Sequence, residues 1–96
     1  MVLKTVWSQT AIDTYIANIQ YLEKEWTNKE VRGFKDSVQR KLQALLIHPN
    51  LGKRTGKRTS LRQTVVNKRI LMCYRYKPLK KEIQLAYFFN TFQKPQ

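Results

Sequence analysis

The residues best able to do chemistry in this sequence are cations gathered in one window. From Arg40 to Lys81 the chain carries thirteen Lys and Arg residues and no Asp or Glu. The five bases and five acids before this window cancel, as do Glu82 and Lys94 after it, so the window holds the whole formal charge of +13. A folded surface of that sign concentrates polyanions and binds them by releasing counterions. We therefore expect a negatively charged partner: nucleic acid, an acidic protein or both.

Eight of these cations are predicted to form a surface that binds nucleic acid or another anionic target. They fall in a loop that contains glycine and threonine, and on the β-like runs that follow it. We expect them to converge around a concave, partly open face of a sheet, where their charges would act together on a polyanion. The eight residues are Lys53, Arg54, Lys57, Arg58, Arg62, Lys68, Arg69 and Arg75.

The loop consists of a tandem repeat, Gly52-Lys53-Arg54-Thr55 followed by Gly56-Lys57-Arg58-Thr59. Its glycines and lysines invite comparison with the phosphate-binding P-loop, G-x4-G-K-[S/T]. Only three residues separate the two glycines, however, and Arg58 stands where the Ser or Thr belongs. The spacing therefore excludes a nucleoside triphosphatase of that class.

Length and composition predict one small domain over residues 1–96. The apolar content of 42% is enough for a single core and argues against disorder. Cys73 and His48 are the only residues of their types, so we expect no internal disulfide, no zinc site and no cofactor. The N-terminus lacks the apolar stretch of a signal peptide, and no apolar run approaches a membrane span. These features predict a cytoplasmic protein with no membrane partner.

Two helices are predicted after a short strand over residues 2–7. Ser8 is placed as the N-cap of the first helix, which ends near Trp26. Residues 27–30 match the S/T-x-x-E capping box, so a second helix begins almost at once and ends before Pro49. The short link predicts an antiparallel helical hairpin that lies on a sheet. The apolar stripes are Ile12, Tyr15, Ile16, Ile19, Leu22 and Trp26 in the first helix, and Val31, Phe34, Val38, Leu42, Leu45 and Leu46 in the second.

Three β-like runs follow the basic loop, over residues 61–67, 69–76 and 83–90. Their short links predict an antiparallel meander. The complete order is β-α-α-β-β-β, an α+β fold in which an antiparallel sheet carries an N-terminal helical hairpin packed on one face. In the middle run one face is predicted to hold Ile70, Met72, Tyr74 and Tyr76, and the other Arg69, Leu71, Cys73 and Arg75.

Short strings with a definite order run along the whole chain. They are VWS at 6–8, YLEKEW at 21–26, the helical stretch 38–46 with HPNLG at 48–52, LR at 61–62, MCYRY at 72–76 and FNTFQKP at 89–95. No single string is specific, but the ordered set resembles the RelE/ParE superfamily of bacterial type II toxin–antitoxin toxins. The resemblance implies the same β-α-α-β-β-β topology. It also implies a cytoplasmic toxin, neutralised by an acidic antitoxin encoded beside it, whose C-terminal segment wraps the toxin body.

The resemblance implies one of two targets. ParE-like members inhibit DNA gyrase, whereas RelE-like members cleave mRNA in the ribosomal A site. The Glu25-Trp26 end of the first helix and the long hairpin look more like the ParE side, while the basic loop and strands fit the RelE side equally well. Growth arrest through gyrase is therefore slightly favoured. A ribosome-dependent mRNA endonuclease is the alternative, and a basic nucleic-acid-binding or inactive relative is the further alternative.

One departure from the family bears on catalysis. Many relatives carry an Arg on the last strand, which serves RNA cleavage in RelE-like members, and this chain has Phe92 at that position. The Tyr that the best-known RNases place in a C-terminal helix as general base also has no counterpart here. Cleavage through a 2′-hydroxyl still needs cations to stabilise the charged phosphorane, and Arg62 and Arg69 are the candidates.

No residue is a clear general base for such a cleavage. His48 has a suitable intrinsic pKa, but its place at a helix end favours a capping or exposed role. Tyr74, Tyr76 and Tyr87 are more typical of a core or a sheet face than of a catalytic site. The catalytic residues therefore stay unassigned at this level.

Overall fold

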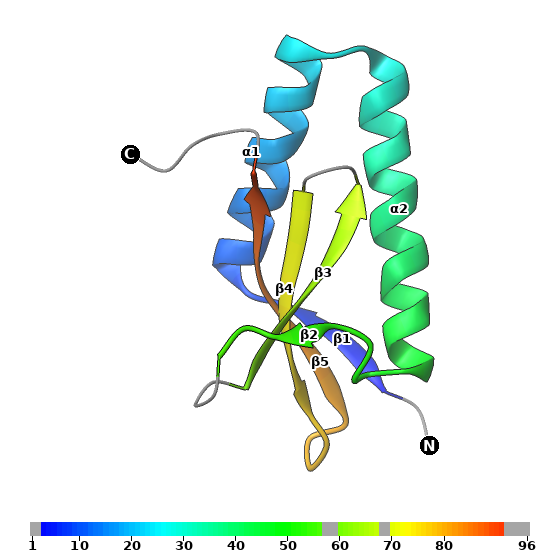
Figure 1. The fold of residues 1–96 in the computed structure, drawn as a ribbon, viewed down its shortest axis with the longest axis vertical. Coiled ribbons are helices and arrows are strands. Elements are labelled where there is room, and N and C mark those ends of the chain that lie inside the picture. Colours follow the sequence, from blue (N-terminus) through cyan, green and yellow to red (C-terminus); the bar gives the residue numbers. More distant parts are fainter. Residues whose placement is uncertain (1–2, 57–59, 68–69, 92–96) are drawn as a thin grey trace.

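The computed structural model describes residues 3–56, 60–67 and 70–91 of the chain. Figure 1 shows two helices side by side, forming a hairpin that covers one face of a twisted sheet. The α+β fold and the predicted order are confirmed, with one addition: a two-residue strand, β2, lies inside the basic loop. The elements are β1 (Lys4–Trp7), α1 (Gln9–Glu25), α2 (Asn28–Ile47), β2 (Lys53–Arg54), β3 (Leu61–Asn67), β4 (Ile70–Lys77) and β5 (Glu82–Asn90).

The five strands form one mixed sheet in the order β1-β5-β4-β3-β2. Strands β3, β4 and β5 make the predicted antiparallel meander. Strand β1 pairs with β5 in parallel. The sequence predicts an antiparallel sheet, and for β1 this prediction is wrong. The physical reason is the connection: two helices separate β1 from the meander, and only a tight hairpin turn obliges neighbouring strands to run antiparallel.

Helix α1 is attached to the sheet where β1 ends. The Ser8 hydroxyl accepts a hydrogen bond from the Ala11 N–H (2.9 Å), which confirms the predicted N-cap, and donates one to the Ala86 carbonyl (2.9 Å). One turn later, the Thr14 hydroxyl accepts from the Phe88 N–H (2.9 Å). These bonds occupy backbone groups on the edge of β5 that β1 no longer reaches, and they set the rotation of α1 about its axis.

The buried face of α1 agrees only in part with the predicted stripe. Ala11 and Leu22 are buried as members of the core, whereas Ile12 and Ile16 are 38% and 47% exposed. Trp26, at the end of the predicted stripe, is 39% exposed. The hydroxyl bonds to β5 turn the Ala11 side of the helix towards the sheet and leave the two isoleucines on its flank. The predicted stripe is therefore half right: Tyr15, Ile19 and Leu22 pack into the core, whereas Ile12, Ile16 and Trp26 do not.

Helix α2 buries the predicted face, with Val31, Phe34, Val38, Leu42 and Leu45 in the core. Its N-terminus is at the predicted place but bonded differently. Thr27 is the N-cap, yet its side chain makes no capping hydrogen bond, and its carbonyl accepts from the Glu30 N–H (3.0 Å). An exposed helix end can leave its first N–H groups to water, so the predicted start of α2 is confirmed and the predicted capping bond of the Thr27 side chain is wrong.

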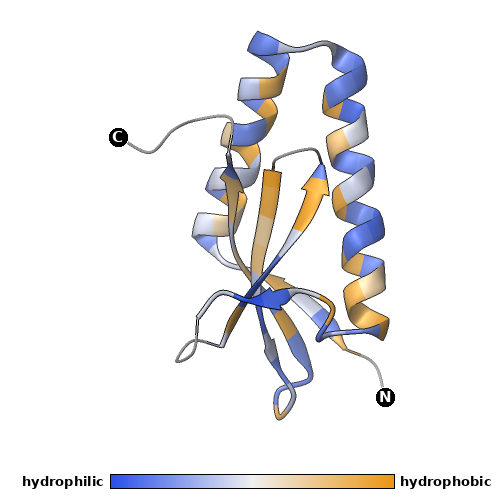
Figure 2. Ribbon diagram, in the orientation of Figure 1, coloured by the Kyte–Doolittle hydropathy of each residue, from blue (hydrophilic) through white to orange (hydrophobic). Residues whose placement is uncertain are grey.

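Aromatic side chains join the two helices to the sheet. Phe34 of α2 lies with its ring centroid 5.4 Å from that of Tyr15 of α1 and 6.1 Å from that of Phe88 of β5. Trp7 stacks on Phe88, with ring centroids 5.7 Å apart. Figure 2 shows apolar residues on the strands between the helices and polar residues at the opposite end of the sheet.

Neither described helix combines the length and the apolarity needed to cross a membrane.

Candidate polyanion-binding surface

Four of the eight predicted cations lie on described strands, and they are divided between the two faces of the sheet. Cross-strand register places Arg54 opposite Arg62, and Arg62 opposite Tyr74, whose side chain is buried beneath the helices. Direct cross-strand neighbours share a face, so both arginines lie on the helix side of the sheet. Because neighbouring residues on a strand alternate, Lys53 and Arg75 lie on the open face.

The predicted surface is therefore only partly assembled by the described residues. The sheet brings Arg54 and Arg62 together, and it places Lys53 and Arg75 on its other side. The remaining predicted cations and the position of the missing family arginine lie outside the described residues. These are Lys57, Arg58, Lys68, Arg69 and Phe92.

Arg62 and Tyr74 together clamp the turn between α2 and β2. The Arg62 guanidinium donates to the Gly52 carbonyl (2.7 Å) and, at 3.3 Å, to the Asn50 carbonyl. The Tyr74 hydroxyl donates to the Pro49 carbonyl (2.9 Å) and accepts from the Gly52 N–H (2.8 Å). Four hydrogen bonds from two side chains thus hold the turn that leads into Lys53 and Arg54. In this structure Arg62 positions the basic strand rather than standing free to meet a phosphate.

The candidate bases occupy structural positions. His48 is exposed and caps α2, donating its backbone N–H to the Ala44 carbonyl (2.7 Å). Burial raises the pKa of Tyr74, outweighing the Gly52 hydrogen bond and the nearby Arg62 charge, which lower it. A hydrogen bond with the Cys73 thiol, and then burial, raises the pKa of Tyr87. A general base needs a pKa near the working pH, and both tyrosines are shifted away from it.

Cys73 is held beside Tyr87 on the open face and is 1% exposed. Burial raises the pKa of its thiol, which outweighs the opposing effect of the Tyr87 hydrogen bond. We expect the native thiol to react with a disulfide reagent more slowly than in the denatured chain, because the thiolate is the reactive form and the sulfur is buried. Absorbance during labelling, with and without denaturant, checks this. Similar rates in both states would contradict the burial of Cys73.

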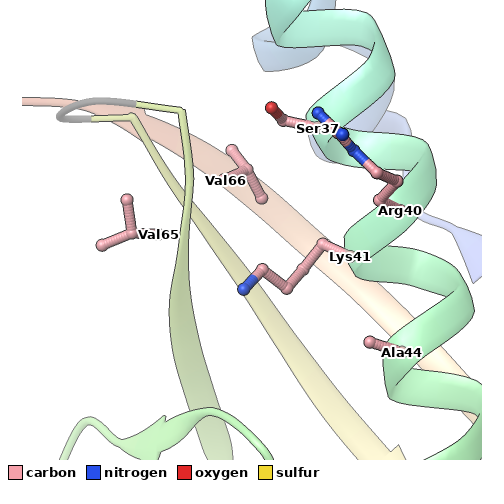
Figure 3. A pocket seen from close by; sticks show the side chains of 6 residues that line it. All are labelled: Ser37, Arg40, Lys41, Ala44, Val65 and Val66. Atoms are coloured by element: carbon pink, nitrogen blue, oxygen red, sulfur yellow. The ribbon is translucent and has the colours of Figure 1, made fainter.

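A groove runs between α2 and the outer edge of β3. A hollow of about 260 Å³ lies between the two, and a second of about 450 Å³ continues to the turn before β2. Both are lined by Lys41 and Val65. In Figure 3 the Lys41 side chain reaches from α2 towards the strands, whereas Arg40 extends along the helix towards Ser37. Lys53 lies at the far end, and none of the described residues that line the two hollows is acidic.

The strand beside this groove is incompletely paired. Strand β2 covers β3 only at Arg62 and Gln63, so among the described residues no strand pairs with the outer edge of β3 beyond Gln63. Val65 on this segment is 51% exposed. An open edge with an apolar side chain is a template for strand addition. Lys41, which lines the groove, was inside the basic window but was not among the eight predicted residues. Its position between Val38 and Leu42 of the buried stripe could have indicated that Lys41 lies near the sheet.

The acids of the chain lie almost entirely away from the strands. Five of the six are on the helices, and Glu82 is the sixth. Its carboxylate lies 3.7 Å from the Lys4 ammonium, and a hydrogen bond from Gln84 is the main cause of its lowered pKa. Among the described residues, no three His, Cys, Asp or Glu side chains are grouped so that they could hold a metal ion. The strand end of the molecule is therefore a cationic surface.

No family model and no curated protein sequence matches this chain. Among solved structures, it resembles a chain of one described as "Chromosomal ParDE TA system from P. aeruginosa", with a TM-score of 0.72. The match covers 92% of this chain and 95% of that chain, at 14% sequence identity. The chain has a RelE/ParE-like fold. At this identity the likeness concerns the fold alone, and the RelE/ParE-like fold is the one that the ordered strings predicted.

Proposed function

We propose that this chain is the toxin of a bacterial type II toxin–antitoxin module and acts in the cytoplasm. The observation that carries the proposal is the fold, which matches a chain of a ParDE TA system over nearly the full length of both chains. The concentration of positive charge on the strands supports it, because a cationic surface suits a protein held by an acidic partner. Fold alone does not determine function, so the partner and the target need their own arguments.

The antitoxin is proposed to place an acidic, extended segment in the groove between α2 and β3. The free edge of β3 offers backbone groups for strand addition, and Val65 offers an apolar contact. Lys41 and Lys53 line the same groove and would pair with carboxylates of the incoming segment. An acidic segment that is disordered alone would fold as it binds, because its own charge prevents it from forming a core.

Reversing the charge of the groove should weaken the complex with the antitoxin. We expect Lys41→Glu to raise the dissociation constant at least tenfold, about 1.4 kcal/mol, because it sets a like charge against the acidic segment. Titration calorimetry with the small acidic protein encoded beside this chain measures the effect. Lys29→Glu is the matched control, since it makes the same charge change in the first turn of α2, where an acid suits the helix dipole. Equal loss in both variants would remove the groove from the proposal.

Growth arrest is proposed to proceed by inhibition of DNA gyrase. Arg62, one of the two catalytic candidates, is engaged by the carbonyls of Gly52 and Asn50, and the pKa shifts of Tyr74 and Tyr87 disfavour either as a base. A toxin that acts by binding a topoisomerase needs no such groups. The cations of β2 and β4 would then contact negatively charged groups of gyrase or of the DNA that gyrase holds.

Induced expression with pulse labelling of DNA, RNA and protein tests this target. We expect DNA synthesis to stop first, together with an SOS response, and the arrest to be relieved by the antitoxin. If protein synthesis stops first, the chain acts at the ribosome as an mRNA endonuclease, and the gyrase proposal is wrong. If growth continues, the chain is a nucleic-acid-binding or inactive relative, and the toxin proposal itself is wrong.

A further inference from the structure

The turn between β4 and β5 presents a leucine that contributes nothing to the core. Leu79 is 99% exposed, more than any other large apolar side chain described. Figure 1 shows this turn at the end of the molecule remote from the link between α1 and α2. A leucine whose side chain is bare in the folded state gains no burial free energy on folding. Its apolar surface is available to whatever the turn meets.

Backbone hydrogen bonds close this turn and connect it to β1. The Lys81 N–H donates to the Pro78 carbonyl (3.2 Å), which closes the turn, and the Lys4 N–H donates to the Lys81 carbonyl (3.1 Å), which ties the turn to β1. Lys81 has φ = 55°, a left-handed conformation that a glycine would adopt with less strain. The chain therefore keeps a cationic side chain at a position where its backbone is strained. Leu79 thus lies in a turn that two backbone hydrogen bonds hold, at the end of β4 and β5 and beside the start of β1.

Cations lie on both sides of this leucine in the turn. Lys77, Lys80 and Lys81 belong to the turn or its flank, and a hollow of about 290 Å³ is lined by Lys77, Pro78, Leu79 and Lys80. The acid at the base of the turn, Glu82, is matched by Lys4. An exposed apolar side chain flanked by cations fits a partner in which apolar faces are stacked between rows of negative charges.

We propose that the β4–β5 turn is a wedge for duplex DNA, in which Leu79, beside Pro78, enters between two stacked base pairs. Leucine and proline are among the residues that proteins insert at base steps, and the cost of unstacking is offset by phosphate contacts around the inserted group. Here those contacts come from the lysines of the turn, while Arg75 and Lys77, two residues apart on β4, continue the cationic track along the open face. A lipid surface fits less well, because even one whole acyl chain gives only marginal binding to a membrane.

The test uses a short DNA duplex that carries 2-aminopurine at a central TA step, a step that unstacks easily. The fluorescence of 2-aminopurine rises when the base leaves the stack. We expect the full wild-type chain to bind the duplex and raise the fluorescence severalfold, and Leu79→Ala to bind within about tenfold of the wild-type affinity with no rise. Ile47→Ala is the matched control, because Ile47 is 73% exposed at the end of α2 and its loss should leave the signal unchanged.

A second variant separates the charges from the wedge. Lys80→Ala should keep the fluorescence rise. It should also make the dependence of log K on log salt less steep by about 0.9, the value for one phosphate contact. The wedge is wrong if the wild-type chain does not bind the duplex, if it binds with no fluorescence rise, or if Leu79→Ala raises the signal as the wild type does. Binding to anionic vesicles that depends on Leu79, with no DNA signal, would assign the turn to lipid. No antitoxin, gyrase or ribosome is present, so the outcome is independent of the proposed function.

Discussion

Replacing Phe34 with alanine should lower the free energy of unfolding by about 3–5 kcal/mol, the range for removing a fully buried aromatic side chain. Phe34 is 0% exposed and lies between Tyr15 of α1 and Phe88 of β5, so its ring is the contact at which both helices meet the sheet. Its loss leaves a cavity that none of these elements can close, because α1 is also tied to β5 by the hydroxyl bonds of Ser8 and Thr14. Urea denaturation followed by circular dichroism measures the effect.

Phe34→Leu is the control for this prediction. Leucine keeps the site apolar and fills much of its volume, so the cost should stay near 1.5 kcal/mol. A loss below about 1 kcal/mol for the alanine variant would mean that the helical hairpin does not depend on this contact. With a typical domain stability of roughly 5–15 kcal/mol, the expected loss would leave Phe34→Ala marginally folded.

The second large effect is expected at Gly52, where there is no room for a side chain. A Cβ added there would lie 2.8 Å from the Gln63 carbonyl oxygen, 2.8 Å from a ring carbon of Tyr74 and 2.9 Å from its hydroxyl. One of these neighbours is backbone in β3, and the other is a fully buried ring, so neither can move aside cheaply. We expect Gly52→Ala to cost about 3 kcal/mol, at the upper end for an overpacked site. It should also displace Lys53 and weaken binding of the acidic partner.

Gly33→Ala provides the matched comparison for Gly52→Ala. Gly33 lies inside α2, and an added Cβ there would meet nothing within 4 Å. Alanine is the better helix former, so this variant should gain up to about 1 kcal/mol of stability. The same denaturation measurement should therefore give opposite signs for the two glycines. A neutral Gly52→Ala would show that the turn before β2 is free to shift, and that the clamp by Arg62 and Tyr74 does not hold it.

Much of the fold could be predicted from periodicity. The stripe from Val31 to Leu45 matches the buried face of α2, because that helix has a single apolar face and only one way to bury it. Helix α1 has apolar residues over a wider arc, and its period alone could not choose between Ala11 and Ile12 as the inward side. The inward side is set by two hydrogen bonds to β5, from Ser8 to Ala86 and from Phe88 to Thr14, whose partners lie 78 and 74 positions apart in the chain.

The cationic surface could likewise be predicted in part from the sequence, and the rest depends on the tertiary structure. The concentration of charge between Arg40 and Lys81 is a property of the sequence, and any compact fold of this chain must present most of it on its surface, because unpaired charges are too costly to bury. The face on which each cation lies depends on strand register. That register put Arg62 next to Tyr74, where its guanidinium binds carbonyls of the turn, and so gave a positioning role to a residue that the sequence marked for phosphate.

The sequence by itself therefore determined the elements other than β2, their order, the core of α2 and the cationic character of the strand region. Each of these depends on a local pattern or on the charges of the residues, which folding does not change. Only the tertiary structure decided the parallel pairing of β1, the side on which α1 packs, the open edge of β3 beside Lys41, and the exposure of Leu79. Each of these rests on contacts between residues far apart in the chain. Their geometry is set by packing and register, and neither has a signature within one segment.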